Sequence, residues 1–353
     1  MTRITLDKMM VEHAVYGGAV LGGGGGGWIE DGLEMGRLAI DTAHPELWTV
    51  DELQVEDLLA TVSLVGAPAA KGKYVKPIYH SKALDMLAKQ IGKPIQGIIT
   101  NENGAETTVN GWFQSAITGI PIVDIPCNGR AHPTGSMGSM NLSELSDYIS
   151  YQAAVGGKGS NYTELSVSGS LDKASTIIRK ASIEAGGLLA VARNPVTVAY
   201  AKENGAAGAI QQAIEVGEAL LSHTGEAAID AVVRKLGGKV VTEGTVTDFC
   251  LETTGGFDVG MVTIDNSYDI TFWNEYMTIE KSGHRFATFP DLIMTLDART
   301  AMPVVSAAIE KGQQVAVITV PKEHLILGST MRNEQLMKPV EEIIKKSILD
   351  YNF

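Results

Sequence analysis

The stretch that decides the fold runs from residue 97 to residue 133 and has three parts. It begins with Gly-Ile-Ile-Thr-Asn-Glu-Asn-Gly (97–104), continues through residues 105–118, and ends with Gly-Ile-Pro-Ile-Val-Asp-Ile-Pro-Cys-Asn-Gly-Arg-Ala-His-Pro (119–133). Apolar β-branched residues followed by a cluster of turn formers predict a strand at 98–99. Apolar residues at helical spacing predict a helix within 105–118, and the apolar run 120–125 predicts a second strand.

A strand, a helix and a second strand predict one parallel crossover, which brings both polar loops to the same edge of a sheet. In open α/β sheets, ligands bind beyond the carboxyl ends of the strands. We therefore expect an active site at this edge. Its side chains would be Glu102, Asn103, Asp124, Cys127, Asn128, Arg130 and His132.

Composition narrows the class of protein. The chain has 353 residues, enough for two domains, with 44% apolar and 20% charged residues, which is typical of a globular protein. The net charge of −13 and the absence of a basic run exclude nucleic acid as an expected partner. The sequence has neither an apolar signal core at its start nor an apolar run of the ~18 residues that span a bilayer. With only two, widely separated cysteines, the pattern favours a cytoplasmic protein without a membrane segment.

The pattern of elements predicts an α/β fold with two domains. Residues 1–165 would form an N-terminal α/β domain with a mostly parallel or mixed sheet, which carries the candidate site. Residues 166–353 would form a C-terminal domain with a helical part (171–235) interrupted by a short strand (188–191), a β-rich part (237–330) and a terminal helix (334–349). A short helix is expected at 142–151, and Asn194-Pro195 is expected to start another.

Six consecutive glycines occupy positions 22–27, between two predicted helices. A dinucleotide-binding fingerprint requires a preceding strand, and the acidic residues Glu30, Asp31 and Glu34 at the start of the next helix disfavour a phosphate there. A nucleotide-dependent enzyme is therefore disfavoured. Two interpretations stay open: a mobile or tightly packed turn, or a backbone cradle in which Gly24, Gly25 and Gly26 bind a small polar or anionic substrate.

Cys127 is a candidate nucleophile or metal ligand. Arg130 and His132 follow within five residues, and neighbouring positive charge lowers the pKa of a thiol. Cys127 could equally be a buried packing residue. Asp124, Cys127 and His132 are suitable ligand types for a divalent metal such as zinc, although their spacing matches no known signature.

Glu102 and Asp124 are the candidates for general acid–base catalysis, because each ends a predicted strand. Asp124 could instead cap the turn at Gly129-Arg130. Arg130 would bind a substrate carboxylate through its planar guanidinium, with Asn103 and Asn128 beside it. Weaker candidates are Trp112, Trp273, Asn274 and Glu275.

With these residues in place, the sequence resembles the S-methyl thiohydantoin desulfurase-like family over nearly its whole length. The most specific match is Pro121-Ile122-Val123-Asp124 leading to Gly129-Arg130-Ala131-His132-Pro133. Shorter matches are the glycine run, Gly66-Ala67-Pro68, Glu102-Asn103-Gly104, Gly255-Gly256-Phe257-Asp258-Val259-Gly260, Asn274-Glu275-Tyr276 and Pro290-Asp291-Leu292-Ile293. The sequence departs from the family's usual pattern at Cys127-Asn128, His132, Trp28 and the lysines after Pro68.

The resemblance implies a hydrolase in which water replaces the methylthio group of a five-membered ring and leaves a hydantoin. The substrate would be a small hydantoin-like or S-methyl thiohydantoin-like heterocycle. Family members are commonly encoded beside hydantoinase/oxoprolinase subunits, so the alternative is a non-catalytic ligand-binding or accessory subunit of such a complex. A homo-oligomer is also an expectation.

Overall fold

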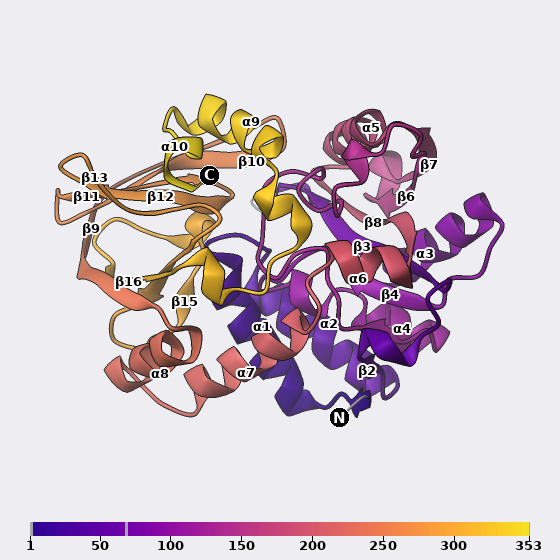
Figure 1. The fold of residues 1–353 in the computed structure, drawn as a ribbon, viewed down its shortest axis with the longest axis horizontal. Coiled ribbons are helices and arrows are strands. Elements are labelled where there is room, and N and C mark those ends of the chain that lie inside the picture. The colour runs from indigo at the N-terminus through magenta and orange to yellow at the C-terminus, as the bar shows by residue number, and fades with distance from the viewer. Residues whose placement is uncertain (1–2, 68–69, 353) are drawn as a thin grey trace.

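The computed structural model describes residues 3–67 and 70–352 of the chain. Within them the strands form two eight-stranded sheets, which lie on opposite sides of the molecule (Figure 1). The first sheet is mixed and is accompanied by helices, and the second is antiparallel. These observations confirm the predicted α/β class with a β-rich C-terminal part. Pro68, part of the Gly66-Ala67-Pro68 match, lies outside the described residues.

The first sheet has the strand order β1-β2-β5-β4-β3-β8-β6-β7. Strands β2, β5, β4 and β3 are parallel, and the strands at both flanks are antiparallel. Ile98 of β4 pairs with Ile122 of β5, so the predicted crossover through α4 is present. The bounds are β1 Arg3–Thr5, β2 Glu46–Trp48, β3 Leu58–Gly66, β4 Gly97–Thr100, β5 Ile122–Val123, β6 Ser150–Gly156, β7 Thr163–Gly169 and β8 Leu188–Thr197.

The second sheet has the order β13-β12-β11-β10-β9-β16-β14-β15, and its pairs are antiparallel. Hairpins join most of its strands, as expected from the short β-branched runs separated by turn residues. The bounds are β9 Lys239–Thr254, β10 Phe257–Ile264, β11 Tyr268–Trp273, β12 Glu275–Lys281, β13 His284–Thr288, β14 Leu292–Asp297, β15 Pro303–Val304 and β16 Gln314–Val320.

Helix α1 joins the two halves. Its first turn is capped by the Asp7 carboxylate, which accepts the N–H of Met10 at 2.8 Å. A Cβ on Gly17 of α1 would lie 1.8 Å from a carbonyl of α7, so only glycine permits this close helix contact. The helix bounds are α1 Lys8–Gly22, α2 Ile29–Thr42, α3 Pro77–Ile91, α4 Trp112–Thr118, α5 Leu171–Glu184, α6 Val198–Asn204, α7 Ala209–Leu221, α8 Glu226–Leu236, α9 Glu334–Ile344 and α10 Leu349–Asn352.

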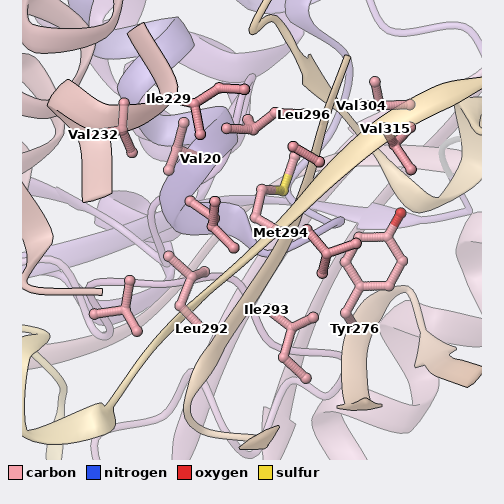
Figure 2. Close-up of a cluster of buried hydrophobic side chains, with 14 of the residues drawn as sticks. Val20, Ile229, Val232, Tyr276, Leu292, Ile293, Met294, Leu296, Val304 and Val315 are labelled. Carbon is pink, nitrogen blue, oxygen red and sulfur yellow. The ribbon is translucent and has the colours of Figure 1, made fainter. Parts of the chain in front are cut away.

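The largest hydrophobic core lies between the second sheet and helices α1, α7 and α8. Figure 2 shows Val20 of α1 beside Ile229 and Val232 of α8, facing Met294 and Leu296 of β14. The C-terminal end of α1 therefore lies in the core of the C-terminal half, while Val11, Ala14 and Val15 pack in a core of the first half. No helix in the described ranges is long and apolar enough to cross a membrane.

Two local predictions are wrong. Residues 142–151 form a single 3-10 turn (Leu142–Glu144) and then enter β6, because pairing of β6 with β7 and β8 outweighs the local helical pattern. Asn194 and Pro195 lie inside β8 at a bulge opposite β3, where proline's missing N–H costs no ladder bond. The helix begins instead at Val198, capped by Thr197.

The first sheet continues beyond residue 165, the expected end of the N-terminal domain. Strand β7 spans that position. Helix α5 then packs against the sheet, and β8 joins the sheet between β3 and β6. As a result, β8 places Arg193 at the middle of the first sheet, where it pairs with Thr61 of β3.

Candidate active site

A pocket lies where the carboxyl ends of β3 and β4 face the second sheet. It encloses about 900 Å³ of empty space, including open solvent at its mouth. Both halves of the chain contribute to its wall. The polar groups on the wall come from Lys73, Asn101, Glu102, Glu106, Thr107, His132, Thr134, Arg179, Arg193, Asp258, Asn274, Glu275 and Ser306, and the glycine loop 24–27 forms one side.

Glu102 lies at the centre of a buried hydrogen-bond network. Its Oε2 accepts the backbone N–H of His132 at 3.2 Å and the Nδ2 of Asn101 at 3.3 Å. The Oδ1 of Asn101 in turn accepts Arg193 at 2.7 Å. Burial raises the pKa of Glu102 to about 8, against the lowering effect of the His132 N–H donor and the Arg193 charge. This carboxyl therefore ionises near neutral pH, which suits proton transfer.

His132 is a neutral member of this network. Its Nε2 lies 3.2 Å from Glu102 Oε2 and 3.2 Å from Asn101 Nδ2. Burial, and then the charge of Arg193, lower the pKa of His132 to about 3. The imidazole is therefore uncharged, so its proximity to Glu102 is not an ion pair, and His132 positions Glu102 through its backbone N–H.

Two more carboxyl groups lie on the wall. Glu275 is only 2% exposed, and burial together with the charge of Glu102 raises its pKa well above the usual range, opposed by Arg130 and Arg179. Burial likewise raises the pKa of Glu106 to about 8, with a further contribution from Asp31. The pocket is thus lined by acids that hold their protons at neutral pH more readily than exposed acids do.

Two guanidinium groups supply positive charge to the same wall. Arg179 donates to the carbonyls of Gly66 and Gly256 at 3.2 and 3.0 Å, and Arg193 donates to Asn101. In the described part of the chain these hydrogen bonds go to neutral oxygens, and Arg193 Nε has no partner. Both groups can therefore bind an anionic or strongly polar group in the pocket.

The glycine run is a tightly packed turn that also lines the pocket. Gly24, Gly26 and Gly27 have φ values of +97°, +85° and +87°, which side chains rarely adopt. Gly25 has an ordinary φ, but a Cβ there would lie 2.0 Å from Glu275 Oε1. The packed-turn interpretation thus describes the loop, and its use as a substrate cradle stays a proposal.

Several predicted site residues lie outside the pocket wall. Asp124 accepts the N–H groups of Ile210 and Gln211 at 2.7 and 3.2 Å, at the start of α7. Burial raises its pKa to about 6. Cys127 is fully buried with its Sγ 3.3 Å from Thr61 Oγ1, and burial raises the thiol pKa to about 11. Its surroundings are those of a packed thiol and not of an activated thiolate.

Three predicted binding residues form structural hydrogen bonds between segments of the chain: Arg130, Asn103 and Asn128. Arg130 is fully buried, donates to the carbonyls of Pro290 and Asp291, and stacks 4.6 Å over Phe289. Asn103 donates to the carbonyls of Ala209 (2.7 Å) and Gly129 (3.3 Å). Asn128 Oδ1 accepts the N–H of Gly328 at 3.2 Å. These side chains hold the loop 124–133 against α7 and the second half of the chain.

The side chains that the sequence offered as ligand types for a metal, Asp124, Cys127 and His132, do not come together. Across residues 3–67 and 70–352, no three His, Cys, Asp or Glu side chains are grouped so that they could hold a metal ion. Asp124 is engaged with α7, Cys127 with Thr61 and His132 with Glu102, so this donor set does not fit a zinc site.

Sequence reasoning missed Asn101, Arg179 and Arg193 and treated Glu275 as a weak candidate. An arginine directly after the apolar run 188–192 was the available signal for Arg193, because a charge inside a buried strand needs a buried partner or a ligand. Arg179 carried no such signal, since it lies on an amphipathic helix with other basic residues. Only the fold brings these groups beside Glu102.

Comparison with known proteins agrees with this architecture. The family model described as "S-Me-THD-like, N-terminal domain" matches residues 9–166, and "S-Me-THD-like, C-terminal domain" matches residues 170–337. No curated protein matches the sequence. A crystal structure of a protein from Chromobacterium violaceum shares the fold, with 19% identity, a TM-score of 0.70, and coverage of 100% of this chain and 98% of that one. With both domains matched in order, the chain belongs to the S-methyl thiohydantoin desulfurase-like (S-Me-THD-like) family.

Proposed function

We propose that the protein hydrolyses a small S-methyl thiohydantoin-like ring, replacing the methylthio group with oxygen. The observation that carries this proposal is Glu102, a buried carboxyl group at the pocket wall whose pKa of about 8 allows it to exchange protons near neutral pH. The family name points to the same chemistry. The products would be a hydantoin and methanethiol.

In the proposed reaction, ionised Glu102 acts as the general base. It removes a proton from a water molecule while the water oxygen attacks the ring carbon that carries sulfur. The attack forms the C–O bond and moves the C=N electrons onto the ring nitrogen. The C=O bond then forms as the C–S bond breaks, and the two protons of the water end on the ring nitrogen and on the sulfur of the departing methanethiol. Asp124, the other sequence-based candidate for this role, has its carboxylate occupied by two N–H groups of α7.

Substrate binding would fall to Arg179 and Arg193. The sequence-based role of Arg130, holding a carboxylate tail, passes to these two guanidiniums because Arg130 is bound to backbone carbonyls behind the pocket. Arg193 also donates to Asn101, which donates to Glu102. Asn101 would therefore connect the substrate-binding guanidinium to the general base by hydrogen bonds. The glycine loop would close the side of the pocket against the ring.

The test is turnover of S-methyl thiohydantoin and of hydantoin compounds, with product identified by mass spectrometry. Detection by a thiol reagent alone would carry a background from the exposed Cys250. We expect conversion by the wild-type protein and a loss of about 100-fold or more in kcat for Glu102→Gln. Glu243→Gln, at an exposed position of β9, is the matched control.

Absence of product with every compound would reject the hydrolase. If calorimetry nevertheless detected binding, the alternative would stand: a ligand-binding or accessory subunit of a hydantoinase/oxoprolinase-type complex. Retention of the protein on an immobilised hydantoinase would support that partner. The mass of the protein in solution would show whether it forms a homo-oligomer.

A further inference from the structure

We infer that Glu275 is a second catalytic carboxyl group, acting as the acid opposite Glu102, and that Asn274 is the residue that positions it. This inference rests on the proposed hydrolysis and deepens it. It concerns the second half of the chain, where the sequence offered Asn274 and Glu275 only as weaker candidates.

Glu275 is placed as a group that acts on a ligand. It begins β12, lies on the pocket wall, and is 2% exposed. Within the described residues its Oε2 has no hydrogen-bond partner. A buried carboxyl oxygen without a partner costs free energy of folding, so its presence in a pocket indicates a ligand that completes it.

The backbone before Glu275 is held in an unusual conformation. Asn274 has φ +55° and exchanges two hydrogen bonds with Asp258: its N–H donates to Asp258 O at 2.7 Å, and its Oδ1 accepts the Asp258 N–H at 2.9 Å. The hydroxyl of Ser306 donates to Asn274 O, and the backbone N–H of Ser306 donates to Gly24 O at 2.9 Å. Asparagine tolerates this left-handed conformation better than most residues do. Three segments thus fix the direction in which Glu275 leaves the backbone.

The surroundings of the two carboxyl groups differ. Glu102 accepts two N–H donors, which favour its ionised form, whereas Glu275 Oε2 accepts none. Burial and the charge of Glu102 both keep the pKa of Glu275 high. When a single proton is shared in this pocket it therefore stays on Glu275, which leaves Glu102 as the base and Glu275 as the acid.

The proton transfers balance over the reaction. Glu275 protonates the ring nitrogen as Glu102 takes a proton from water, giving a tetrahedral carbon with hydroxyl and methylthio groups. Ionised Glu275 then removes the hydroxyl proton while protonated Glu102 gives its proton to sulfur. The C=O bond forms, the C–S bond breaks, and methanethiol leaves. Both carboxyl groups return to their starting states, with water as the only co-reactant.

The first experiment compares Glu275→Gln with the wild-type protein. Glutamine keeps the shape but cannot transfer a proton, so kcat should fall about 100-fold while KM changes little. The wild-type rate should rise with pH through about 8, as Glu102 ionises, and fall at higher pH as Glu275 loses its proton. Glu275→Gln should lack that alkaline fall.

An active wild-type protein with an unchanged Glu275→Gln variant would overturn this inference alone, whereas an inactive wild-type protein would overturn the proposed function as well. If Glu275→Gln fails to fold, Glu275→Asp retains the acid but withdraws it from the pocket. Glu275→Asp should have a lower kcat than the wild-type protein, and its rate should still fall at high pH. A kcat equal to that of the wild-type protein would contradict the inference.

The second experiment tests Asn274 as a positioning residue. Asn274→Gly keeps the left-handed backbone but loses the Oδ1 acceptor. We expect about a tenfold lower kcat and a shift in the pH at which the rate falls on the alkaline side. Asn274→Asp retains an acceptor oxygen and should restore most of the rate. The matched control is Asn266→Gly, at an exposed hairpin turn with φ +50°. Equal kcat and pH profiles for Asn274→Gly and Asn266→Gly would overturn the positioning role.

Discussion

Replacing Gly25 with alanine should disable the pocket by moving Glu275. A Cβ at this position would lie 2.0 Å from Oε1, 2.6 Å from Cδ and 2.8 Å from Cγ of Glu275, so all three nearest atoms belong to one side chain. Because Gly25 does not have a left-handed φ, alanine adds no backbone strain there. The substitution is therefore a steric test of a single contact.

The size of the effect follows from this geometry. Ordinary contact begins at 3.4 Å, so the carboxyl oxygen must retreat by about 1.4 Å or the loop must shift by a similar distance. Overpacking a buried site costs about 1–3 kcal/mol of stability. Misplacing a catalytic group by about 1 Å lowers the rate by about 100-fold. We expect Gly25→Ala to lose both stability and kcat within these ranges.

Urea denaturation and turnover of an S-methyl thiohydantoin measure the two losses. In a Glu275→Ala background the added methyl group has no opposing side chain, so its stability cost should fall to within about 0.5 kcal/mol of zero. Gly169→Ala is the control, because a Cβ there meets nothing within 4 Å. If Gly25→Ala were as stable and active as Gly169→Ala, or if the cost persisted without the Glu275 side chain, the contact would not hold Glu275 in place.

Three further substitutions separate packing from chemistry. Cys127→Ala should keep its kcat and lose about 1–2 kcal/mol of stability, because the thiol is buried with a pKa of about 11; an inactive but folded variant would restore Cys127 as a nucleophile. Asp124→Asn should lower the free energy of unfolding in urea by about 1 kcal/mol through the weakened cap on α7, with kcat unchanged; a loss of kcat without a loss of stability would contradict that role. Arg193→Met should raise KM for a carboxylate-bearing substrate by about 10-fold or more, the value of a charge-assisted hydrogen bond, and initial-rate kinetics with an uncharged analogue, whose KM should change less, checks it.

The fold was predictable where local patterns and chain order act together. The crossover through β4, α4 and β5 combines strand, helix and strand signals within a short span, and these determined its topology. Residues 142–151 and Asn194-Pro195 behaved differently, because their conformations depend on pairing between strands distant in sequence. Proline at a helix start and proline at a β-bulge carry the same local signature, and only the partner strand distinguishes them.

The site divides in the same way. Glu102 and His132 were predictable as pocket residues because each follows a strand of the parallel crossover. Cys127 lies in the same loop, but Arg130 and His132, which are close to it in sequence, do not place positive charge beside its thiol. Arg130 turns away to the carbonyls of Pro290 and Asp291, and His132 is buried and neutral, so burial sets the state of the thiol. The sequence predicts which residues share a loop, but it does not predict the directions in which their side chains point.

The glycine loop explains why the two halves of the chain form one site. In the glycine run 22–27, the Gly26 carbonyl accepts the N–H groups of Glu106 and Thr107 from the first half at 2.9 and 3.2 Å. The carbonyls of Gly23 and Gly24 accept the N–H groups of Tyr276 and Ser306 from the second half at 2.7 and 2.9 Å. The end of the helix that precedes the loop packs, through Val20 and Leu21, in the core of the second sheet (Figure 2). The proposed base comes from one half and the proposed acid from the other. Because the loop is bonded to both, neither half can present its carboxyl group correctly without the other.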